Sequence, residues 1–222
     1  MLNRILKAIQ RRYIKFVGDP TLKLITMVFI KPVYYTTGNE SAISINNWFM
    51  QKVLGYNKEC YWPVHFTSTV SNWKNIFVGI DAAPGISSNC VIDGTNGIYV
   101  DDYAQVAPNV MLLTSNSDKS ENVNNGIHIG KYCRVGMGSV INPGVVLGDF
   151  TTVSAGSVVI DSFPDGYCVI AGNPATMLID YSKNDSIKEK FIRYRNPHEY
   201  NGYIRSSEFE AFKKKHLIAG HR

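Results

Sequence analysis

Residues 129–163 read IGKYCRVGMGSVINPGVVLGDFTTVSAGSVVIDSF and carry a branched apolar residue at every sixth position: Ile129, Val135, Ile141, Leu147, Val153 and Val159. The residue four places after each of the first five is small or β-branched, and glycine recurs between them. A period of six fits neither a 3.6-residue helix nor an ordinary strand pair. It predicts an all-β solenoid in which each turn of chain is a triangle with three short flat faces.

The same period extends upstream of this stretch, with a slip of two residues at Asn96 and Gly97; its earlier positions are Ile80, Ile86, Ile92, Val100, Val106 and Leu112. Two further steps of six from Leu112 reach Asn124 rather than Ile129, so we expect about five extra residues. They fall in the polar stretch TSNSDKSENVNNG, residues 114–126. A loop that leaves a regular rod is a place where function concentrates.

The flanks of the repeat predict helices. We divide the chain into an N-terminal helical and irregular extension (1–59), the solenoid domain (60–178) and a C-terminal helical segment (179–222). Residues 2–17 have the pattern of a basic amphipathic helix, which would pack its apolar stripe on the first turn or a neighbouring subunit, or lie on a membrane surface. Residues 44–54 predict a second helix. One or two C-terminal helices (within 185–195 and 206–217) are expected across the last turn, where they would protect its strand edges.

Charge and cysteine content limit the partners and the cellular compartment that we expect for this protein. The net charge of +5 comes from the termini: residues 1–35 carry seven basic side chains against one acidic, whereas residues 36–180 carry six against twelve. No nucleic-acid-binding motif accompanies the basic ends, so we expect no nucleic-acid partner. The four cysteines lack zinc-site spacing, which predicts no metal site and favours buried thiols in a reducing compartment over disulfides. With no signal peptide visible and no apolar run long enough to span, we expect a cytoplasmic protein, with association at the inner membrane face as an option.

The segments VINPGVVLGD, VSAGSVV and VIAGNPA, the single extruded loop and the lead-in WPVHFTS resemble the hexapeptide-repeat acyltransferases. Within that family the chain is similar to the galactoside/maltose O-acetyltransferases and to the acetyltransferases of capsule and O-antigen biosynthesis. The resemblance covers residues 60–180. It implies a left-handed parallel β-helix, a homotrimer, and acetyl-CoA bound as acyl donor between neighbouring rods.

The resemblance also places a catalytic base on the loop, and here the sequence departs from the family. The family has a histidine in a stretch like S-x-N-H-D or T-G-H-P; the matching stretch in this chain is LLTSNSD, with Asn116, Ser117 and Asp118 at its end and Ser117 at the histidine position. A serine hydroxyl ionises too weakly to act as a base at neutral pH. The loop predicts either a weak or inactive copy, or another base, or slow turnover through binding and positioning alone.

Two histidines and Asp118 are the alternative bases. His128 adjoins the inward Ile129 and should point outward at the loop's exit, as a reactive group or as an ordinary surface histidine. His65 lies in the lead-in and would either fold back toward the substrate or serve a structural hydrogen bond. Asp118 would need desolvation to raise its pKa.

The remaining candidates are binding residues. Asn89 aligns with an asparagine that contacts the acceptor in sugar acetyltransferases; alternatively it is a corner residue with positive φ. With His65 it forms our substrate-binding prediction. The cofactor-binding prediction comprises Arg134, Gly136, Ala155, Gly156, Asn173 and Pro174. For Arg134 the alternative is a surface charge, and for Asn173 and Pro174 an ordinary turn.

The sequence thus predicts an acetyl-CoA-dependent O-acetyltransferase that acts on a saccharide hydroxyl, in surface polysaccharide biosynthesis. One alternative is a trimeric binding or scaffold protein that has lost its base, which CoA affinity would distinguish. Another is N-acylation of an amino sugar, because an unprotonated amine needs less help from a base.

Overall fold

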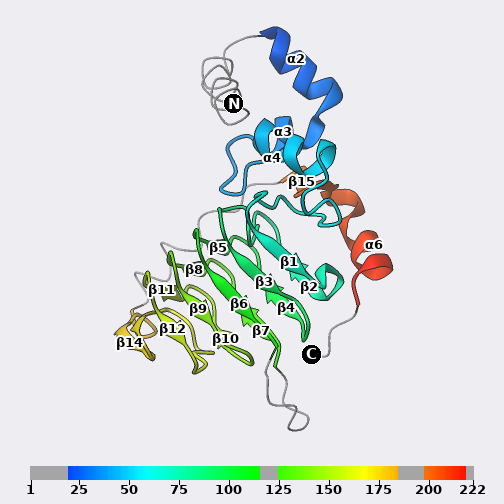
Figure 1. The fold of residues 1–222 in the computed structure, drawn as a ribbon. Helices are drawn as coiled ribbons and strands as arrows, with labels where there is room; N and C mark the ends of the chain where they lie inside the picture. The colour runs from blue at the N-terminus through cyan, green and yellow to red at the C-terminus, as the bar shows by residue number, and fades with distance from the viewer. Residues whose placement is uncertain (1–19, 116–124, 185–197, 219–222) are drawn as a thin grey trace, which may run out of the picture.

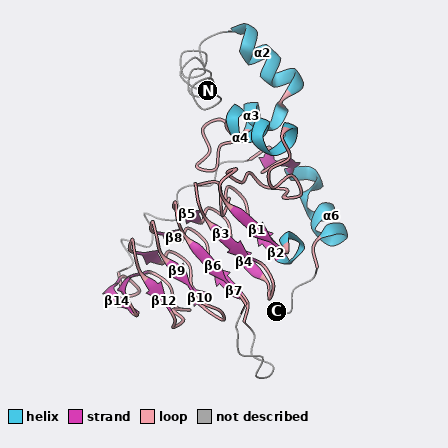
Figure 2. Cartoon of the chain, viewed as in Figure 1, coloured by secondary structure: helices cyan, strands magenta, loops and turns pink. Residues whose placement is uncertain are grey.

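The computed structural model describes residues 20–115, 125–184 and 198–218. Its centre is a left-handed parallel β-helix, in which short strands stack into three flat faces around a triangular coil (Figure 1). This confirms the predicted all-β solenoid. Helices lie at the end of the rod where the coil begins (Figure 2).

Each face is one sheet, and the chain visits the faces in a fixed order. Face 1 contains β1 (Thr69–Ser71), β3 (Val91–Asp93), β6 (Met111–Leu113), β9 (Val140–Ile141) and β12 (Val158–Val159). Face 2 contains β2 (Ile76–Val78), β4 (Ile98–Val100), β7 (Ile127–Ile129) and β10 (Val146–Leu147). Face 3 contains β5 (Gln105–Val106), β8 (Arg134–Val135), β11 (Thr152–Val153), β13 (Cys168–Gly172) and the antiparallel β14 (Ala175–Asp180).

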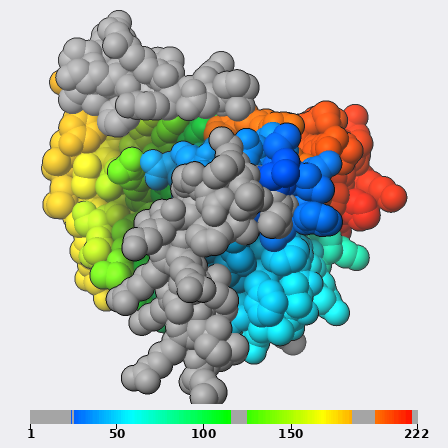
Figure 3. All heavy atoms as spheres, turned by 90° about the horizontal axis from the view of Figure 1, so that it is seen from above, coloured from blue at the N-terminus to red at the C-terminus, as the bar shows by residue number. Residues whose placement is uncertain are grey.

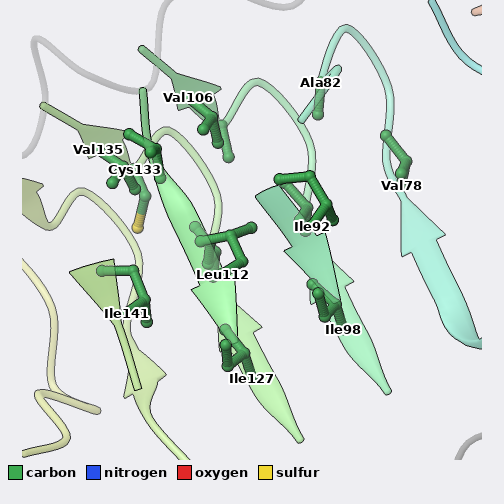
Figure 4. Packing of buried hydrophobic residues seen from close by; sticks show 14 of the residues in the cluster. Val78, Ala82, Ile92, Ile98, Val106, Leu112, Ile127, Cys133, Val135 and Ile141 are labelled. Carbon is green, nitrogen blue, oxygen red and sulfur yellow. The ribbon is translucent and has the colours of Figure 1, made fainter. Parts of the chain in front are cut away.

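The six-residue period is the distance between faces. Ile141 pairs with Val159, Ile129 with Leu147 and Val135 with Val153, and each pair is separated by one full coil, which is three periods of six. These side chains point into the coil and are at most 2% exposed. They stack on one another along the rod, as Figure 4 shows for its first coils. Such burial contributes about 1.5–3 kcal/mol for each large aliphatic side chain.

The first coil departs from the predicted phase. Ile92 pairs with Leu112, two positions beyond three full periods, which confirms the slip of two residues. Ile80 and Ile86, however, are only partly buried, and the inward positions of the first coil are Ile76 and Val78. The prediction for Ile80 and Ile86 was therefore wrong, because the row that contains Val100 and Ile129 begins at Val78 on β2, two residues before Ile80, and a longer segment separates β2 from β3.

The loop is larger than the sequence count indicated. Leu112 pairs with Ile141, whereas three periods of six from Leu112 would reach only Gly130, so eleven residues are inserted rather than about five. The count was wrong because it placed an extra face between Leu112 and Ile129, whereas β7 is the face that directly follows β6. The predicted residues Asn116, Ser117 and Asp118 lie outside the described part of the chain.

The N-terminal extension is helical and irregular where it is described. It contains α2 (Pro20–Phe29), α3 (Lys31–Tyr35), α4 (Ile45–Trp48) and the π-helix η1 (Phe49–Val53). The last two match the helix predicted over 44–54, and the Ser44 hydroxyl caps it by accepting from the Asn47 N–H at 3.0 Å. The helix predicted over 2–17 lies outside the described residues. A 3₁₀ turn, η2 (Trp73–Asn75), joins β1 to β2.

The C-terminal helix lies at the opposite end of the rod from the one predicted. After the hairpin β15 (Tyr200–Asn201) and β16 (Ile204–Arg205), α6 (Ser206–His216) packs Phe209 and Phe212 on Tyr61 beside the first coil, with ring centroids 6.0 and 5.0 Å away. Figure 3 shows these orange and red residues beside the blue and cyan ones. The expectation that a helix covers the last turn was wrong for α6: its apolar face meets an aromatic cluster at the first coil, and β14 pairs with the last strand edge instead. The segment 185–195 lies outside the described residues.

All four cysteines are free and buried, as predicted. Burial raises the pKa of the Cys133 thiol to about 12, so this side chain behaves as a small apolar core residue. Within the described ranges, no helix is both long enough and apolar enough to cross a membrane.

Candidate functional site

One corner of the β-helix, between face 3 and face 1, is built from asparagine and glycine. We call Asn89, Asn109, Gly138 and Gly156 the open corner. Each takes a positive φ, between 58° and 71°. Backbone hydrogen bonds hold them in register: the N–H of Asn109 donates to Ser88 O at 2.9 Å, that of Gly138 to Pro108 O at 3.0 Å, and that of Gly156 to Met137 O at 2.8 Å.

Toward the last coils this corner carries two glycines, with the exposed Met137 next to Gly138 in the sequence. At Gly138 and Gly156 no atom lies within 4 Å of the position that a Cβ would take, and Ala155 beside them is exposed. Gly136 differs, because its Cβ would lie 2.5 Å from Ala155 N in the next coil. The absence of a side chain at Gly136 is therefore required by coil packing, whereas Gly138 and Gly156 leave a strip where a thin molecule can approach the backbone.

The turn that follows β13 continues this corner. The Gly172 N–H donates to Ser157 Oγ at 3.3 Å, one residue past Gly156. Asn173 and Pro174 form the exposed tip between β13 and β14. The structure thus gathers Ala155, Gly156 and the Asn173–Pro174 turn at one corner, while their predicted contact with a cofactor stays a prediction.

At the end of the corner nearest the first coil, three polar residues form a continuous chain of hydrogen bonds. The Asn89 N–H donates to Thr67 Oγ1 at 3.0 Å, and Thr67 Oγ1 lies 2.8 Å from His65 Nδ1. The Thr67 N–H also donates to His65 Nδ1, at 3.2 Å. Asn89 Nδ2 donates to Asn109 Oδ1 at 3.3 Å. The two predicted substrate residues, His65 and Asn89, are therefore joined through Thr67, which the sequence analysis did not single out.

Asp93 anchors the start of the loop. Its carboxylate accepts from the Ser115 N–H at 2.8 Å, from the hydroxyls of Ser115 and Thr95, and from Ser71 Oγ at 2.9 Å. Burial alone would raise the pKa of Asp93, but these hydrogen bonds outweigh it and hold the pKa well below its usual value. The loop therefore leaves face 1 beside an anionic carboxylate that is held by several hydrogen bonds.

His128 is on face 2, away from the open corner of the same chain. It points outward, as predicted, and its Nε2 lies 2.9 Å from Asp101 Oδ2, close enough for an ion pair when the histidine is protonated. Asp101 was missed by the sequence analysis, although Val100 pairs with Ile129 directly beside it. His128 and Asn89 do not share a face, so one chain does not bring this histidine to Asn89.

Arg134 lies on face 3, exposed, between Gln105 and Thr152 in the same outward row. It stands two residues before Gly136 and faces solvent. In the part of the chain that the structure describes, no three His, Cys, Asp or Glu side chains are grouped closely enough to hold a metal ion.

The corner between face 2 and face 3 is aromatic. Tyr103, Tyr132, Phe150 and Tyr167 all have positive φ and stack in sequence, with ring centroids 4.8–4.9 Å apart. Large residues rarely adopt this backbone conformation, so each position carries strain that the stacking offsets in part. One such residue stands on each successive coil, and this recurrence is readable in the sequence once the insertion is counted correctly.

Comparison with known proteins supports the family. A model described as bacterial transferase hexapeptide (six repeats) matches residues 126–161. The galactoside O-acetyltransferase of Escherichia coli (strain K12) is 32% identical over 130 residues, which is 55% of this chain. The chain spans 61% of the length of that relative.

Two solved structures match this chain, and the first has a similar fold. A galactoside acetyltransferase in complex with coenzyme A has a TM-score of 0.52 and 22% identity, and the match covers 82% of this chain and 89% of that one. A maltose O-acetyltransferase from Clostridium difficile 630 has a TM-score of 0.48 and 21% identity, and covers 68% and 87%. The repeat, the three-faced coil and the family model show that this chain carries bacterial transferase hexapeptide repeats, and over 130 residues it is similar to a galactoside O-acetyltransferase.

Proposed function

We propose that this protein is an acetyl-CoA-dependent O-acetyltransferase acting on a saccharide, in the assembly of a surface polysaccharide such as capsule or O-antigen. The observation that carries the proposal is the open corner, which has open space at Gly138 and Gly156 and leads to the Asn173–Pro174 turn, in a chain that is 32% identical to a galactoside O-acetyltransferase over 130 residues. The second feature that supports the proposal is the long insertion, whose start at Ser115 is held by Asp93. An inserted loop of this length can contact an acceptor.

The open corner fits the pantetheine arm of CoA. A thin chain that runs along Gly138 and Gly156 meets no side chain at either glycine. Backbone and small side chains there offer hydrogen bonds and close approach, and Asn173 would face the nucleotide end. When bound, acetyl-CoA supplies the activated acetyl group; the residues of this chain hold it, exclude water and orient the acceptor.

A single rod presents this corner to solvent, so we propose a homotrimer in which a neighbouring rod closes the other side. Closed threefold assembly also buries flat faces that one coil leaves exposed. In such a trimer His128 of one copy could approach the open corner of another copy. Within its own chain, His128 lies on a different face from that corner. Arg134, outward on face 3, would then meet either CoA phosphate or the adjoining rod.

The transfer needs a donor for the tetrahedral oxyanion and a base for the acceptor proton. Ser117 occupies the position where similar proteins carry the base, so we infer slow turnover unless Asp118 or His128 replaces it. N-acylation of an amino sugar is the second candidate function, and Ser117 is the residue that favours it. An unprotonated amine attacks the thioester carbonyl without prior proton removal, so it is less affected by the missing histidine.

A location at the inner membrane face is part of the proposal. Helix α2 exposes Leu24 (61%), Val28 (53%) and Phe29 (77%), and residues 1–35 carry seven basic side chains. Apolar residues flanked by basic ones suit the surface of an anionic bilayer. This would bring the protein to lipid-linked saccharide precursors.

The test is thiol release from acetyl-CoA with a panel of saccharides and amino sugars, comparing the wild type with Ser117→His. We expect the substitution to raise turnover with hydroxyl acceptors by about two to four orders of magnitude, the range for general base catalysis. A fast wild type that gains nothing from Ser117→His would identify another base, and His128→Ala would follow. CoA binding without turnover in either protein would favour the scaffold alternative, and the absence of both would refute the enzyme.

A further inference from the structure

We propose that His65 donates a hydrogen bond to the acceptor. Thr67 and Asn89 hold its ring in place, at the end of the open corner nearest the first coil. This role rests on the proposed function and adds the contact that would orient the acceptor. It is carried by the direction of the hydrogen bonds around the imidazole.

The first step is the tautomer of His65. A backbone N–H can only donate, so the bond from the Thr67 N–H to His65 Nδ1 requires a lone pair on that nitrogen. Nδ1 is therefore unprotonated, and the ring proton of the neutral imidazole is on Nε2. Burial lowers the pKa of His65, which also keeps the ring neutral at physiological pH.

The second step is the role of Thr67. Its hydroxyl accepts from the Asn89 N–H at 3.0 Å, so its own proton is free to point at His65 Nδ1, 2.8 Å away. The bonds run in one direction, from Asn89 through Thr67 to His65, and end at the Nε2–H. Bonds aligned in this way polarise one another, which strengthens the final donor.

The third step is availability. Both hydrogen-bond contacts of the ring converge on Nδ1, and Nε2 makes no hydrogen bond with any residue that the structure describes. The ring is held in place by stacking on Phe66, with centroids 4.5 Å apart, while His65 remains partly exposed.

The fourth step is location. Asn89 begins the open corner, and its amide bonds to Asn109 one coil further on. Asp93, which anchors the loop, is the last residue of β3, four residues after Asn89 and about 13 Å from it for an extended chain. His65, which is joined to Asn89 through Thr67, therefore lies beside the corner where we place the acyl group.

A neutral donor with its proton on Nε2 cannot also accept the acceptor's proton at that atom. His65 therefore does not replace the base missing at Ser117; it binds a saccharide oxygen and holds the hydroxyl or amine in line for attack. Thr67 is a positioning residue that selects the tautomer.

The experiment combines kinetics with nitrogen spectroscopy. His65→Ala should lower kcat/KM for the acceptor by about ten-fold, the effect of one lost hydrogen bond, and leave the affinity for acetyl-CoA unchanged. His65→Gln, whose amide nitrogen can occupy the place of Nε2, should retain activity within about three-fold, whereas His65→Asn should not. Thr67→Val should behave like His65→Ala, with Thr69→Val on the exposed strand β1 as its matched control.

Long-range ¹H–¹⁵N correlations of the wild type, with His65 assigned by its loss in His65→Gln, should show the proton on Nε2. Thr67→Val removes the hydroxyl but keeps the backbone N–H, so it should shift only part of the population toward Nδ1–H. An Nδ1–H tautomer in the wild type, or unchanged acceptor kinetics in His65→Ala while the wild type transfers acetyl, would overturn the role of His65 alone. A wild type that binds no CoA and releases no thiol would overturn the proposed function and this role together.

Discussion

Gly136 and Ala155 were predicted together as cofactor residues, and the structure separates them into a packing role and an exposed role. In Gly136→Ala the new Cβ would lie 2.5 Å from Ala155 N and 2.7 Å from Val153 O, where ordinary contacts are 3.4–4 Å. Both atoms are backbone, and Val153 O already accepts from the Gly136 N–H at 2.8 Å. The neighbouring coils must therefore move apart. Overpacking of this kind costs about 1–3 kcal/mol, or roughly 2–12 °C in Tm for a chain of this size.

Ala155→Leu is the matched variant, since Ala155 is exposed and the larger side chain meets no strain. We expect its unfolding free energy to stay within about 0.5 kcal/mol of wild type, and its affinity for CoA to fall about ten-fold, because the side chain would cover the open corner. Urea unfolding at one fixed protein concentration measures the first quantity, since assembly couples to stability; calorimetric titration with CoA measures the second. A Gly136→Ala protein as stable as wild type, or an Ala155→Leu protein with undiminished CoA affinity, would refute the reasoning.

Three further predictions concern other parts of the molecule. The aromatic corner predicts a coupling of about 0.5–1.5 kcal/mol between Tyr132 and Phe150 in a double-mutant cycle with Tyr132→Asn and Phe150→Asn, because asparagine tolerates positive φ and the cycle isolates the stacking; a coupling near zero would leave the strain there unexplained. Because the folded pKa of Asp93 is depressed, its contribution to stability is full above the unfolded pKa of about 3.9 and is lost as pH falls below it. Asp93→Asn should therefore lower Tm at neutral pH and converge on wild type in acid, and a difference that persists undiminished in acid would contradict this. Finally, replacing Leu24 and Phe29 with glutamate should reduce sedimentation with anionic vesicles several-fold, whereas Leu178→Glu on β14, exposed at the other end of the rod, should not.

The fold was predictable because a single physical rule repeats along the chain. Each face buries one side chain every six residues, so the aliphatic period in residues 129–163 specifies strand, corner and stacking together. The rule fails where residues are inserted, since the interval from Leu112 to Ile129 divides equally well into two periods plus five residues or one period plus eleven. The supposed extra face needs one apolar inward residue, six places after Leu112 or six before Ile129; Val123 meets the second condition, so the sequence alone did not exclude the shorter insertion.

That miscount also concealed part of the candidate site. With eleven inserted residues, Val100 falls beside Ile129, and Asp101 then comes within reach of His128. The five-residue count shifts face 2 out of register and leaves His128 without a visible partner. The position of α6 was predicted wrongly for a different reason. Amphipathic spacing predicts a helix and its apolar face, but either end of a solenoid has a terminal coil that a helix can cover. Only the aromatic cluster around Tyr61 distinguishes the two ends.

The two halves of the proposed reaction depend on different kinds of structure. The corner assigned to the acyl donor consists of backbone and small residues held by the repeat itself, so few single substitutions outside it can remove it. The base of the proposed reaction, in contrast, would be one side chain in the inserted segment, outside the repeat. A serine at position 117 is therefore compatible with an intact donor site. It follows that Ser117→His should change turnover while the CoA affinity stays that of the wild type, and that a scaffold descended from such an enzyme would keep its corner longer than its base.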